Sequence, residues 1–228
     1  MTHSIVSHEK WPNARTAFLG KEKEFTRQRE ELARERRQLP WERVEKPYVF
    51  EALEGRLSLA ELVGKYDQLI VYHFMFGPDW QEGCPGCSFW ADNFNGVDAH
   101  LAARDTALVA VSRAPLATLE AYKKRMGSDF RWVSSVGNDF NYDFVVTRRP
   151  DEKVMPYNYG LTPREAEELP GLSTFVKEGD AVFHTYSTYA RGLDVVNGAY
   201  HLLDLTAKGR HEEGLSHPMA WVRRHDRY

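Results

Sequence analysis

Cys84 and Cys87 are the residues of this sequence best suited to chemistry, and they are its only two cysteines. Pro85 and Gly86 stand between them, so the thiols belong to a Cys-Pro-Gly-Cys segment. Two cysteines are too few for the disulfide framework of a small secreted protein, and a chain of 228 residues can bury a sufficient core without one. A pair of thiols at this spacing therefore indicates redox chemistry or metal binding.

The segment predicts different tasks for the two thiols, because it follows a loop and opens a helical stretch. The first turn of a helix presents free N–H groups and a partial positive charge, which stabilise a thiolate. Pro85 favours the start of the helix, and Gly86 lets the backbone or a substrate come close. We expect Cys84 to be the exposed nucleophile and Cys87, one turn further along, to be the resolving thiol.

The main alternative use of two such cysteines is a zinc site. A closed structural zinc site needs four ligands, and the remaining ones would have to come from His73, His100, His184 or His201. None of these histidines has zinc-finger spacing, so we predict no metal, and nothing in the sequence indicates a cofactor. A purely structural pair of thiols stays open as a further alternative.

Other residues could contribute to a site around the thiols. Trp80 and Trp90 flank the cysteines and could shape a substrate face, although packing in the core is an equal alternative. Arg113 follows a strand at the edge where α/β folds place ligand sites, so it could hold a thiolate or an anionic substrate. His73 lies inside an apolar run and is expected to be a core histidine.

The elements that must position these residues alternate between strand and helix. Two apolar, β-prone runs are typical of strands covered on both faces, and the cysteines follow the first of them after a loop. The element order is that of a thioredoxin fold, an α/β fold with a central mixed sheet flanked by helices. The predicted elements are strands Tyr48–Ala52, Leu69–Phe76 and Thr106–Ser112, helices Leu57–Val63, Cys84–Ala103, Pro115–Gly127 and Leu193–Leu205, and a hairpin of Thr174–Val176 with Ala181–Tyr186.

We divide the chain into an N-terminal helical extension over 1–46, a thioredoxin-like domain over 47–207 and a C-terminal tail over 208–228. The Pro-rich, acidic stretch at about 148–172 is interpreted as an insertion in that domain. In the extension, Phe18, Phe25, Leu32 and Leu39 recur every seven positions and form a narrow apolar stripe on a charged helix. This stripe could pack on the domain or mediate a homodimer.

The composition excludes several classes of function. The 30 Lys and Arg residues against 33 Asp and Glu leave a net charge of −3, so no bulk positive field attracts nucleic acid or anionic lipid. The most apolar run, Leu69–Phe76, is far shorter than the roughly 20 residues of a membrane span. Met1–Lys23 contains no apolar run of signal-peptide length. We therefore expect a cytoplasmic protein that binds neither nucleic acid nor membranes.

Longer motifs around these residues carry a resemblance to a known family. They are Gly77–Trp80, Gly83–Phe94, Val111–Pro115, Asp139–Phe144, Phe183–Gly192 and Trp221–Asp226. Over nearly the whole chain the sequence resembles a bacterial thioredoxin-like family of unassigned function that is usually labelled "predicted dithiol-disulfide oxidoreductase". The resemblance implies a thioredoxin-like fold, and the label itself implies dithiol chemistry.

The sequence departs from the better-known relatives at two positions. Thioredoxins place a cis-proline before the strand that faces the thiols, and the corresponding position here is expected to hold Ser173. Peroxiredoxins have a catalytic arginine where we expect Leu172, and proline and threonine or serine where Gly77 and Gln81 stand. These departures disfavour a usual peroxidase and thioredoxin-type docking of substrates.

The favoured hypothesis is a thiol–disulfide oxidoreductase that acts on protein or small-molecule thiols and disulfides. Cys84 would attack, Cys87 would resolve, and Trp80, Pro85, Gly86, Arg113 and Ser173 would contribute to substrate binding. A peroxiredoxin-like thiol peroxidase that uses Cys84, with Arg113 stabilising its thiolate, is one alternative. A non-enzymatic binding or assembly module with redox-sensing or vestigial thiols is the other.

Overall fold

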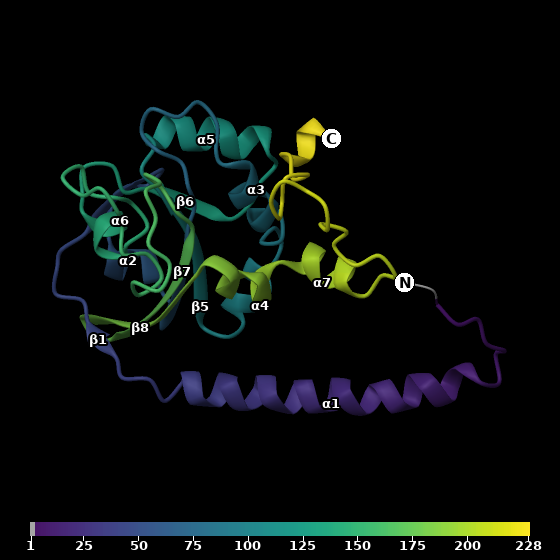
Figure 1. Ribbon diagram of the computed structural model, residues 1–228. Helices are drawn as coiled ribbons and strands as arrows, with labels where there is room; N and C mark the ends of the chain where they lie inside the picture. The colour runs from purple at the N-terminus through teal and green to yellow at the C-terminus, as the bar shows by residue number, and fades with distance from the viewer. Residues whose placement is uncertain (1–2) are drawn as a thin grey trace. The chain divides into compact units, whose positions relative to one another are not determined.

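The computed structural model describes residues 3–228, which divide into two compact units on either side of the Pro40–Trp41 bond. The first unit contains the long helix α1 (Trp11–Arg36), which begins with Pro12 in its first turn (Figure 1). No residue of α1 is buried, and its surface carries ion pairs such as that of Arg27 with Glu24, three residues apart, at 2.5 Å. Alternating charges one turn apart stabilise such a solvated helix.

The second unit is built on one eight-stranded sheet of described residues, in the order β1-β8-β7-β4-β5-β6-β2-β3. Its outer strands are short, and its longest ones form the hairpin of β7 and β8. The strands are β1 (Glu42–Arg43), β2 (Val49–Ala52), β3 (Gly55–Ser58), β4 (Gln68–His73), β5 (Thr106–Ser112), β6 (Arg131–Ser134), β7 (Gly171–Glu178) and β8 (Ala181–Tyr189).

The centre of this sheet has the pairing of a thioredoxin-like fold. Strand β4 runs parallel to β5 and antiparallel to β7, which continues into β8 as a hairpin. The chain then passes from β4 through a loop into α3 (Pro85–Ala91), the helix that carries the cysteines. The predicted α/β fold, with its central mixed sheet and helices, is therefore confirmed.

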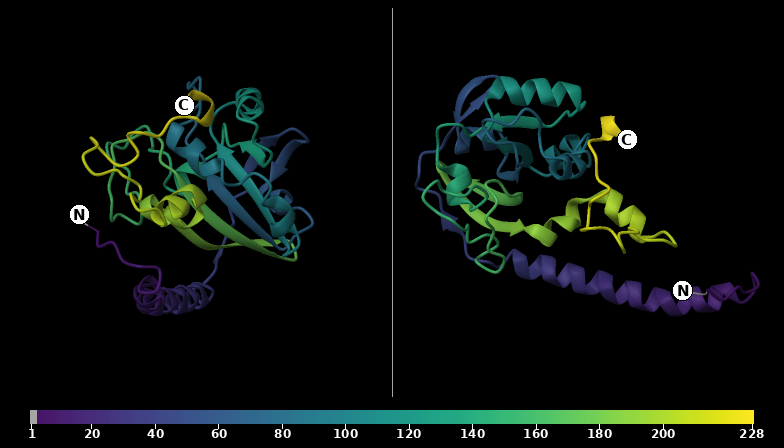
Figure 2. Two further views of the ribbon diagram at one scale, coloured as in Figure 1. Left: turned by 90° about the vertical axis from the view of Figure 1, so that its right-hand side faces the viewer. Right: turned by 45° about the horizontal axis from the view of Figure 1, so that its top comes forward.

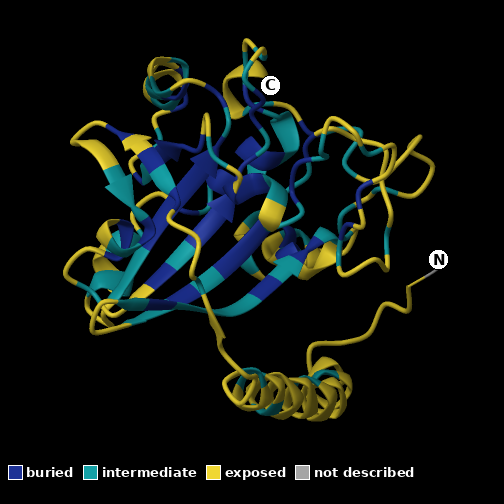
Figure 3. Ribbon diagram, turned by 90° about the vertical axis from the view of Figure 1, so that its left-hand side faces the viewer, coloured by how far each residue is buried: buried dark blue, intermediate teal, exposed yellow. Residues whose placement is uncertain are grey.

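Helices cover both faces of this sheet (Figure 2). On one face, Tyr72, Leu108 and Ala110 pack against α3, α4 (Asp98–Ala102), α5 (Leu116–Arg125) and α7 (Gly198–Asp204). On the other face, Val71 and Val109 pack against α2 (Leu59–Val63) and α6 (Phe140–Asp143). Neighbouring residues of one strand point to opposite faces, and both faces are covered. The central residues of β4 and β5 are therefore apolar, and the two strands are buried along much of their length (Figure 3).

Three predicted helices have different bounds. Residues 55–58 pair with β2 as β3, and α2 begins only after Ser58, whose side chain caps it together with Glu61. The cysteine-bearing stretch divides into α3 and α4, separated by a turn in which Gly96 has a φ of +77°. The last predicted helix is also divided, into the 3₁₀ segment η1 (Ala190–Val196) and α7.

The insertion and the tail contain little regular structure. Residues 148–170 form no helix or strand, and isolated bridges such as Met155–Arg164 hold this excursion in place. After α7 the chain forms turns up to the short 3₁₀ segment η2 (His225–Arg227) and lies beside α3 (Figure 1). Among the described helices, none is both long and apolar enough to cross a membrane.

Candidate functional site: a dithiol cavity at the start of α3

Cys84 is the residue immediately before α3, and Pro85 is the first residue of the helix. The Cys84 N–H donates to the Met75 carbonyl at 3.1 Å, which closes the loop between β4 and the helix. The N–H of Ser88 donates to the Cys84 carbonyl at 3.0 Å and completes the first helical turn. Both thiols are free, with Cys84 partly exposed and Cys87 buried one turn inside. The predicted position of the pair, at a junction of strand and helix, is confirmed.

Donors that favour a thiolate surround the Cys84 sulfur. The Cys87 side chain donates a hydrogen bond to it, the backbone N–H groups of Cys87 and Gly86 add two more, and the Arg224 guanidinium supplies a favourable charge. Together they outweigh burial, which acts in the opposite direction, and lower the pKa of Cys84 to about 6. Cys84 is therefore mostly ionised at neutral pH.

Cys87 has the opposite environment. Its side chain is 3% exposed, and its sulfur accepts a hydrogen bond from the Met75 N–H at 3.4 Å. Burial first, and then the interactions with Cys84, raise the pKa of Cys87 well above that of a free thiol. The pair thus consists of one thiolate and one thiol that keeps its proton.

The C-terminal tail supplies the cation beside the thiolate. Arg224 donates from Nη2 to the Gly83 carbonyl at 2.7 Å and from Nε to the Tyr122 hydroxyl at 3.2 Å. Its Nη1 forms an ion pair with Glu82 at 2.9 Å. Arg224 therefore holds the loop that precedes Cys84 in addition to acting on its charge.

A cavity of about 350 Å³ opens at the two sulfur atoms. Glu212 anchors one wall, because its Oε1 accepts hydrogen bonds from the Tyr200 hydroxyl, the Met219 N–H and the Trp221 indole at 2.8 to 2.9 Å. We refer to residues 212–224 as the C-terminal strap. The cavity is lined by Tyr72, Met75, Cys84, Gly86, Cys87, Trp90, Arg164, Pro170, Ala190, Arg191, Leu193, Asp194, Tyr200, Pro218 and Met219.

The structure brings some of the predicted site residues to the thiols. Gly86 lines the cavity, and a Cβ at this position would approach the Met219 methyl group to 3.1 Å. Pro85 occupies the first turn of α3. Trp90 lines the cavity, whereas Trp80 packs over the backbone of Gly77 and is not part of the lining. The prediction that Trp80 forms the substrate face is therefore wrong for this cavity.

Ser173 lies on the other side of the sheet from the thiols, so its predicted place at the docking face is wrong. It pairs with Val71 across the strands, and it is fully buried in hydrogen bonds to His73 at 2.8 Å and Ser187 at 2.7 Å. Side chains of paired residues point to the same face of a sheet. The residue before β7 that reaches the cavity is Pro170, and none of the described peptide bonds is cis.

Arg113 also lies apart from the thiols. Its Nη1 forms an ion pair at 2.8 Å with Glu168, which is 3% exposed, and its guanidinium lies 5.0 Å from the centre of the Tyr142 ring. Arg113 therefore neutralises a buried carboxylate, which would otherwise be costly. The expected role of Arg113 at the thiolate is not supported, and Arg224 occupies that role instead.

The sequence interpretation missed Arg224, Pro170 and Met219. Arg224 lies within the Trp221–Asp226 motif, which had been noticed only as part of the family resemblance. Its contact with Gly83 spans 141 positions of the chain, and no spacing pattern in the sequence indicates such a contact. Pro170 lies directly before β7, which begins at Gly171 and not at the predicted Thr174, so the predicted bounds did not indicate it.

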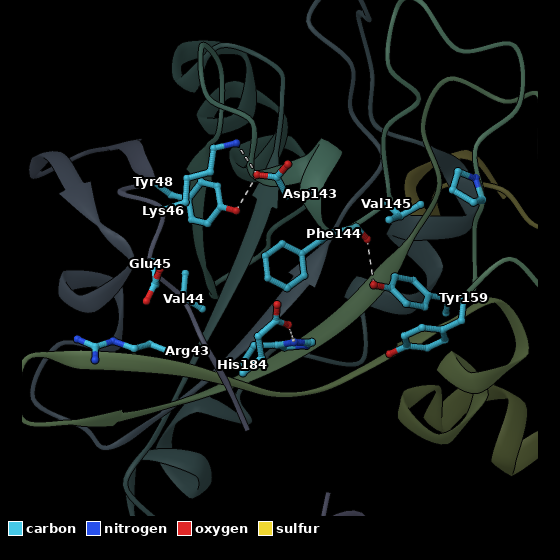
Figure 4. A pocket seen from close by; sticks show the side chains of 13 residues that line it. Arg43, Val44, Glu45, Lys46, Tyr48, Asp143, Phe144, Val145, Tyr159 and His184 are labelled. Atoms are coloured by element: carbon cyan, nitrogen blue, oxygen red, sulfur yellow. Dashed lines mark hydrogen bonds and ion pairs between the residues drawn. The ribbon is translucent and has the colours of Figure 1, made fainter. Parts of the chain in front are cut away.

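A second cavity, of about 360 Å³, lies away from the thiols beside β1 and the loop after α6 (Figure 4). Asp143 is already engaged there, since it accepts hydrogen bonds from both Lys46 and Tyr48 at 2.7 Å. His184 hydrogen-bonds to Ser187 at 2.7 Å and so continues into the buried chain of Ser173 and His73. This polar chain links the side chains of His73, Ser173, Ser187 and His184 and contains no thiol.

Within residues 3–228, no cluster of three or more His, Cys, Asp or Glu side chains is placed to hold a metal ion. The zinc alternative would need such a cluster around Cys84 and Cys87.

Solved structures with similar folds include a point mutant of peroxiredoxin Q from Xanthomonas campestris, at 16% identity over 72% of this chain and 98% of that one (TM-score 0.47). Peroxidoxin BcpB from Mycobacterium tuberculosis has 15% identity, with 69% and 93% coverage (TM-score 0.49). A secreted M. tuberculosis disulfide oxidoreductase homologous to E. coli DsbE has 16% identity, with 67% and 92% coverage (TM-score 0.38).

A search of curated proteins found no match. The pairing of β4, β5 and β7 and the cysteines at the start of α3 identify the fold independently of these similarities. The family is shown by a match over residues 1–228 to the model described as "Bacterial protein of unknown function (DUF899)". The chain belongs to this DUF899 family and has a thioredoxin-like fold.

Proposed function

We propose that this protein is a dithiol–disulfide oxidoreductase that uses Cys84 and Cys87. The observation that carries the proposal is a thiolate at Cys84 beside a protonated thiol at Cys87, both at the wall of one cavity. Thiol–disulfide exchange requires a nucleophilic thiolate and a second thiol that can resolve the mixed disulfide.

The reaction transfers two electrons from the protein to a disulfide. The Cys84 thiolate attacks one sulfur of the substrate, forms a mixed disulfide and expels the other sulfur as a thiolate. Cys87 then loses its proton and attacks the Cys84 sulfur, which releases the second substrate sulfur and leaves a Cys84–Cys87 disulfide. The raised pKa of Cys87 delays its ionisation until the mixed disulfide has removed the negative charge of Cys84.

Trapping with a small neutral disulfide, bis(2-hydroxyethyl) disulfide, tests this assignment of roles. Cys87→Ser should accumulate a stable mixed disulfide on Cys84, observed as an added mercaptoethanol group by mass spectrometry. Wild-type protein should instead reach an internal disulfide, and Cys84→Ser should react far more slowly than Cys87→Ser. A mixed disulfide on Cys87 in the Cys84→Ser variant, formed as fast, would reverse the roles.

The same experiment separates the two other candidate functions. Rapid oxidation by hydrogen peroxide, with no reaction toward disulfides, would favour a thiol peroxidase that uses Cys84. Thiols that react with neither reagent would favour a binding or assembly module. The structure adds no support for the peroxidase through Arg113, because this guanidinium is paired with Glu168.

A further inference from the structure

The cavity at the thiols is enclosed by segments that lie far apart in the sequence. Met219 comes from the C-terminal strap, Pro170 and Arg164 come from the insertion and its end, and Leu193 comes from η1. Its volume of about 350 Å³ is at the lower end of the range of small-molecule sites. A small molecule fits this space, whereas the surface of a folded protein meets the strap and the insertion first.

The inner part of the cavity is apolar. Trp90 uses its indole N–H on the Leu193 carbonyl at 2.8 Å, and Tyr200 uses its hydroxyl on Glu212 at 2.8 Å. These two rings therefore present carbon to the cavity, together with the side chains of Met75 and Met219. A substrate gains affinity here by burying apolar surface.

The rim of the cavity carries one cation that the protein leaves uncompensated. Asp194 is neutralised twice, by Arg191 at 2.7 Å and by Arg210 at 2.9 Å. The Arg164 guanidinium, by contrast, donates to the Pro163 carbonyl at 3.2 Å, and within the described part of the chain no carboxylate lies within ion-pair distance of it. Apart from the Cys84 thiolate, which is the nucleophile, the uncompensated charge of the lining is therefore positive.

We propose that the substrate is a small disulfide with an apolar body and a carboxylate that pairs with Arg164. This inference rests on the proposed function, since Cys84 must attack the disulfide and Cys87 must resolve it. The substrate takes up two electrons and two protons and leaves as a dithiol, while the protein is left with a Cys84–Cys87 disulfide. The apolar body lies along Trp90 and Met219, and the carboxylate remains at the rim.

Lipoate and lipoamide are suitable probes, because they share a cyclic disulfide and an apolar chain and differ in the carboxylate. Oxidation of the reduced protein should be faster with lipoate at low concentration, on the order of fivefold, as expected for one exposed ion pair. Arg164→Gln should abolish this preference, and Arg164→Lys should keep part of it. Lys153→Gln removes the same charge from the same insertion outside the cavity and should keep the preference.

A binding measurement that does not depend on redox chemistry separates the two proposals. Octanoate should slow the alkylation of Cys84 by iodoacetamide more than octanamide does, and Arg164→Gln should remove this difference. Equal protection by both compounds, or equal rates with lipoate and lipoamide, overturns the substrate class even if bis(2-hydroxyethyl) disulfide is reduced. A protein that reduces none of the three disulfides contradicts the proposed function and this inference together.

Discussion

At the scale of single residues, the thiolate of Cys84 depends on two sources of positive potential. One is local, from the hydrogen bonds donated by the Cys87 side chain and by backbone N–H groups of α3. The other is the Arg224 guanidinium, which comes from the far end of the chain. Because the local donors belong to the helix itself, Arg224 is the part of this environment that a substitution can remove without changing α3.

Arg224→Gln is therefore expected to raise the pKa of Cys84. Alkylation of wild-type Cys84 should increase with pH to a plateau with a midpoint near pH 6, because the pKa of Cys84 is lowered to about 6. A rise of one unit in the pKa lowers the thiolate fraction at pH 6 about fivefold, from about one half to about one tenth. This midpoint is measured from the rates of reaction with iodoacetamide between about pH 4 and about pH 9, which covers the titration of the thiol.

The control is Arg223→Gln, because the Arg223 side chain donates to the carbonyls of Ala220 and Val222 and, among the described residues, has no hydrogen bond to the loop before Cys84. An unchanged midpoint in Arg224→Gln, or an equal change in Arg223→Gln, would show that Arg224 does not act on the thiolate.

His73 gives the fold an expected sensitivity to acid. The side chain is 1% exposed, and burial, reinforced by His184, lowers the pKa of His73 to about 3. The unfolded chain binds a proton at this residue below about pH 6.5, whereas the folded chain does not until about pH 3. The stabilisation is thus complete above pH 6.5 and is lost as the pH falls toward 3, at up to about 1.4 kcal/mol per pH unit.

Urea unfolding of wild-type protein and His73→Gln at a series of pH values tests this contribution. The free energy of unfolding should fall less steeply with acid in the variant, because glutamine does not titrate. Parallel curves for the two proteins would assign the acid sensitivity to other groups.

At the scale of elements, the loop between β4 and α3 is held closely against the core. Gly83 is buried beneath the Phe74 and Tyr122 rings, and a Cβ added here would lie 2.6 Å from Phe74 and 2.9 Å from Tyr122. Ring atoms of buried aromatic side chains cannot move away without disturbing their own packing. Gly83 therefore lets the loop pass close enough to the core for Cys84 to reach the start of α3.

Gly83→Ala should destabilise the protein by about 1–3 kcal/mol, the usual cost of overpacking a core. It should also raise the pKa of Cys84, because the Gly83 carbonyl holds Arg224 in place. Chemical denaturation and the pH profile of alkylation measure the two effects. Gly20→Ala, where an added Cβ meets nothing within 4 Å, is the matched control and should not destabilise. Similar stability of both variants would contradict the close packing of the loop.

At the scale of the whole molecule, α1 presents an exposed apolar stripe that no described residue of its own unit buries. Phe18, Phe25 and Leu32 are each more than half exposed and recur every seven residues. A heptad repeat of this kind is typical of helices that pair with one another. We propose that α1 forms a homodimer contact, as the sequence had suggested.

The double variant Phe25→Glu, Leu32→Glu should be monomeric in sedimentation equilibrium, where the wild-type protein should be dimeric. Lys23→Glu changes the charge on the opposite side of the helix, about 200° away from Phe25, and should leave the dimer intact. Thiol reactivity should be the same in all three proteins. A monomeric wild-type protein would exclude the homodimer.

The sequence by itself determined the chemistry and the elements that carry it. The Cys-Pro-Gly-Cys segment, the apolar runs of β4 and β5 and the turn between β7 and β8 are short-range patterns, and burial and turn conformation act over a few residues. For this reason the fold class and the position of Cys84 before a helix were predictable.

Only the tertiary structure decided what surrounds the thiols. The register of β7 turned Ser173 away from the cavity and brought Pro170 to it, because a strand alternates its faces at every residue. Arg113 lies beside buried Glu168, and Arg224 reaches Gly83 across 141 positions. Contacts between residues so far apart in the sequence depend on the paths of irregular loops, which have no periodicity in the sequence. The walls of the cavity could therefore be known only from the folded chain.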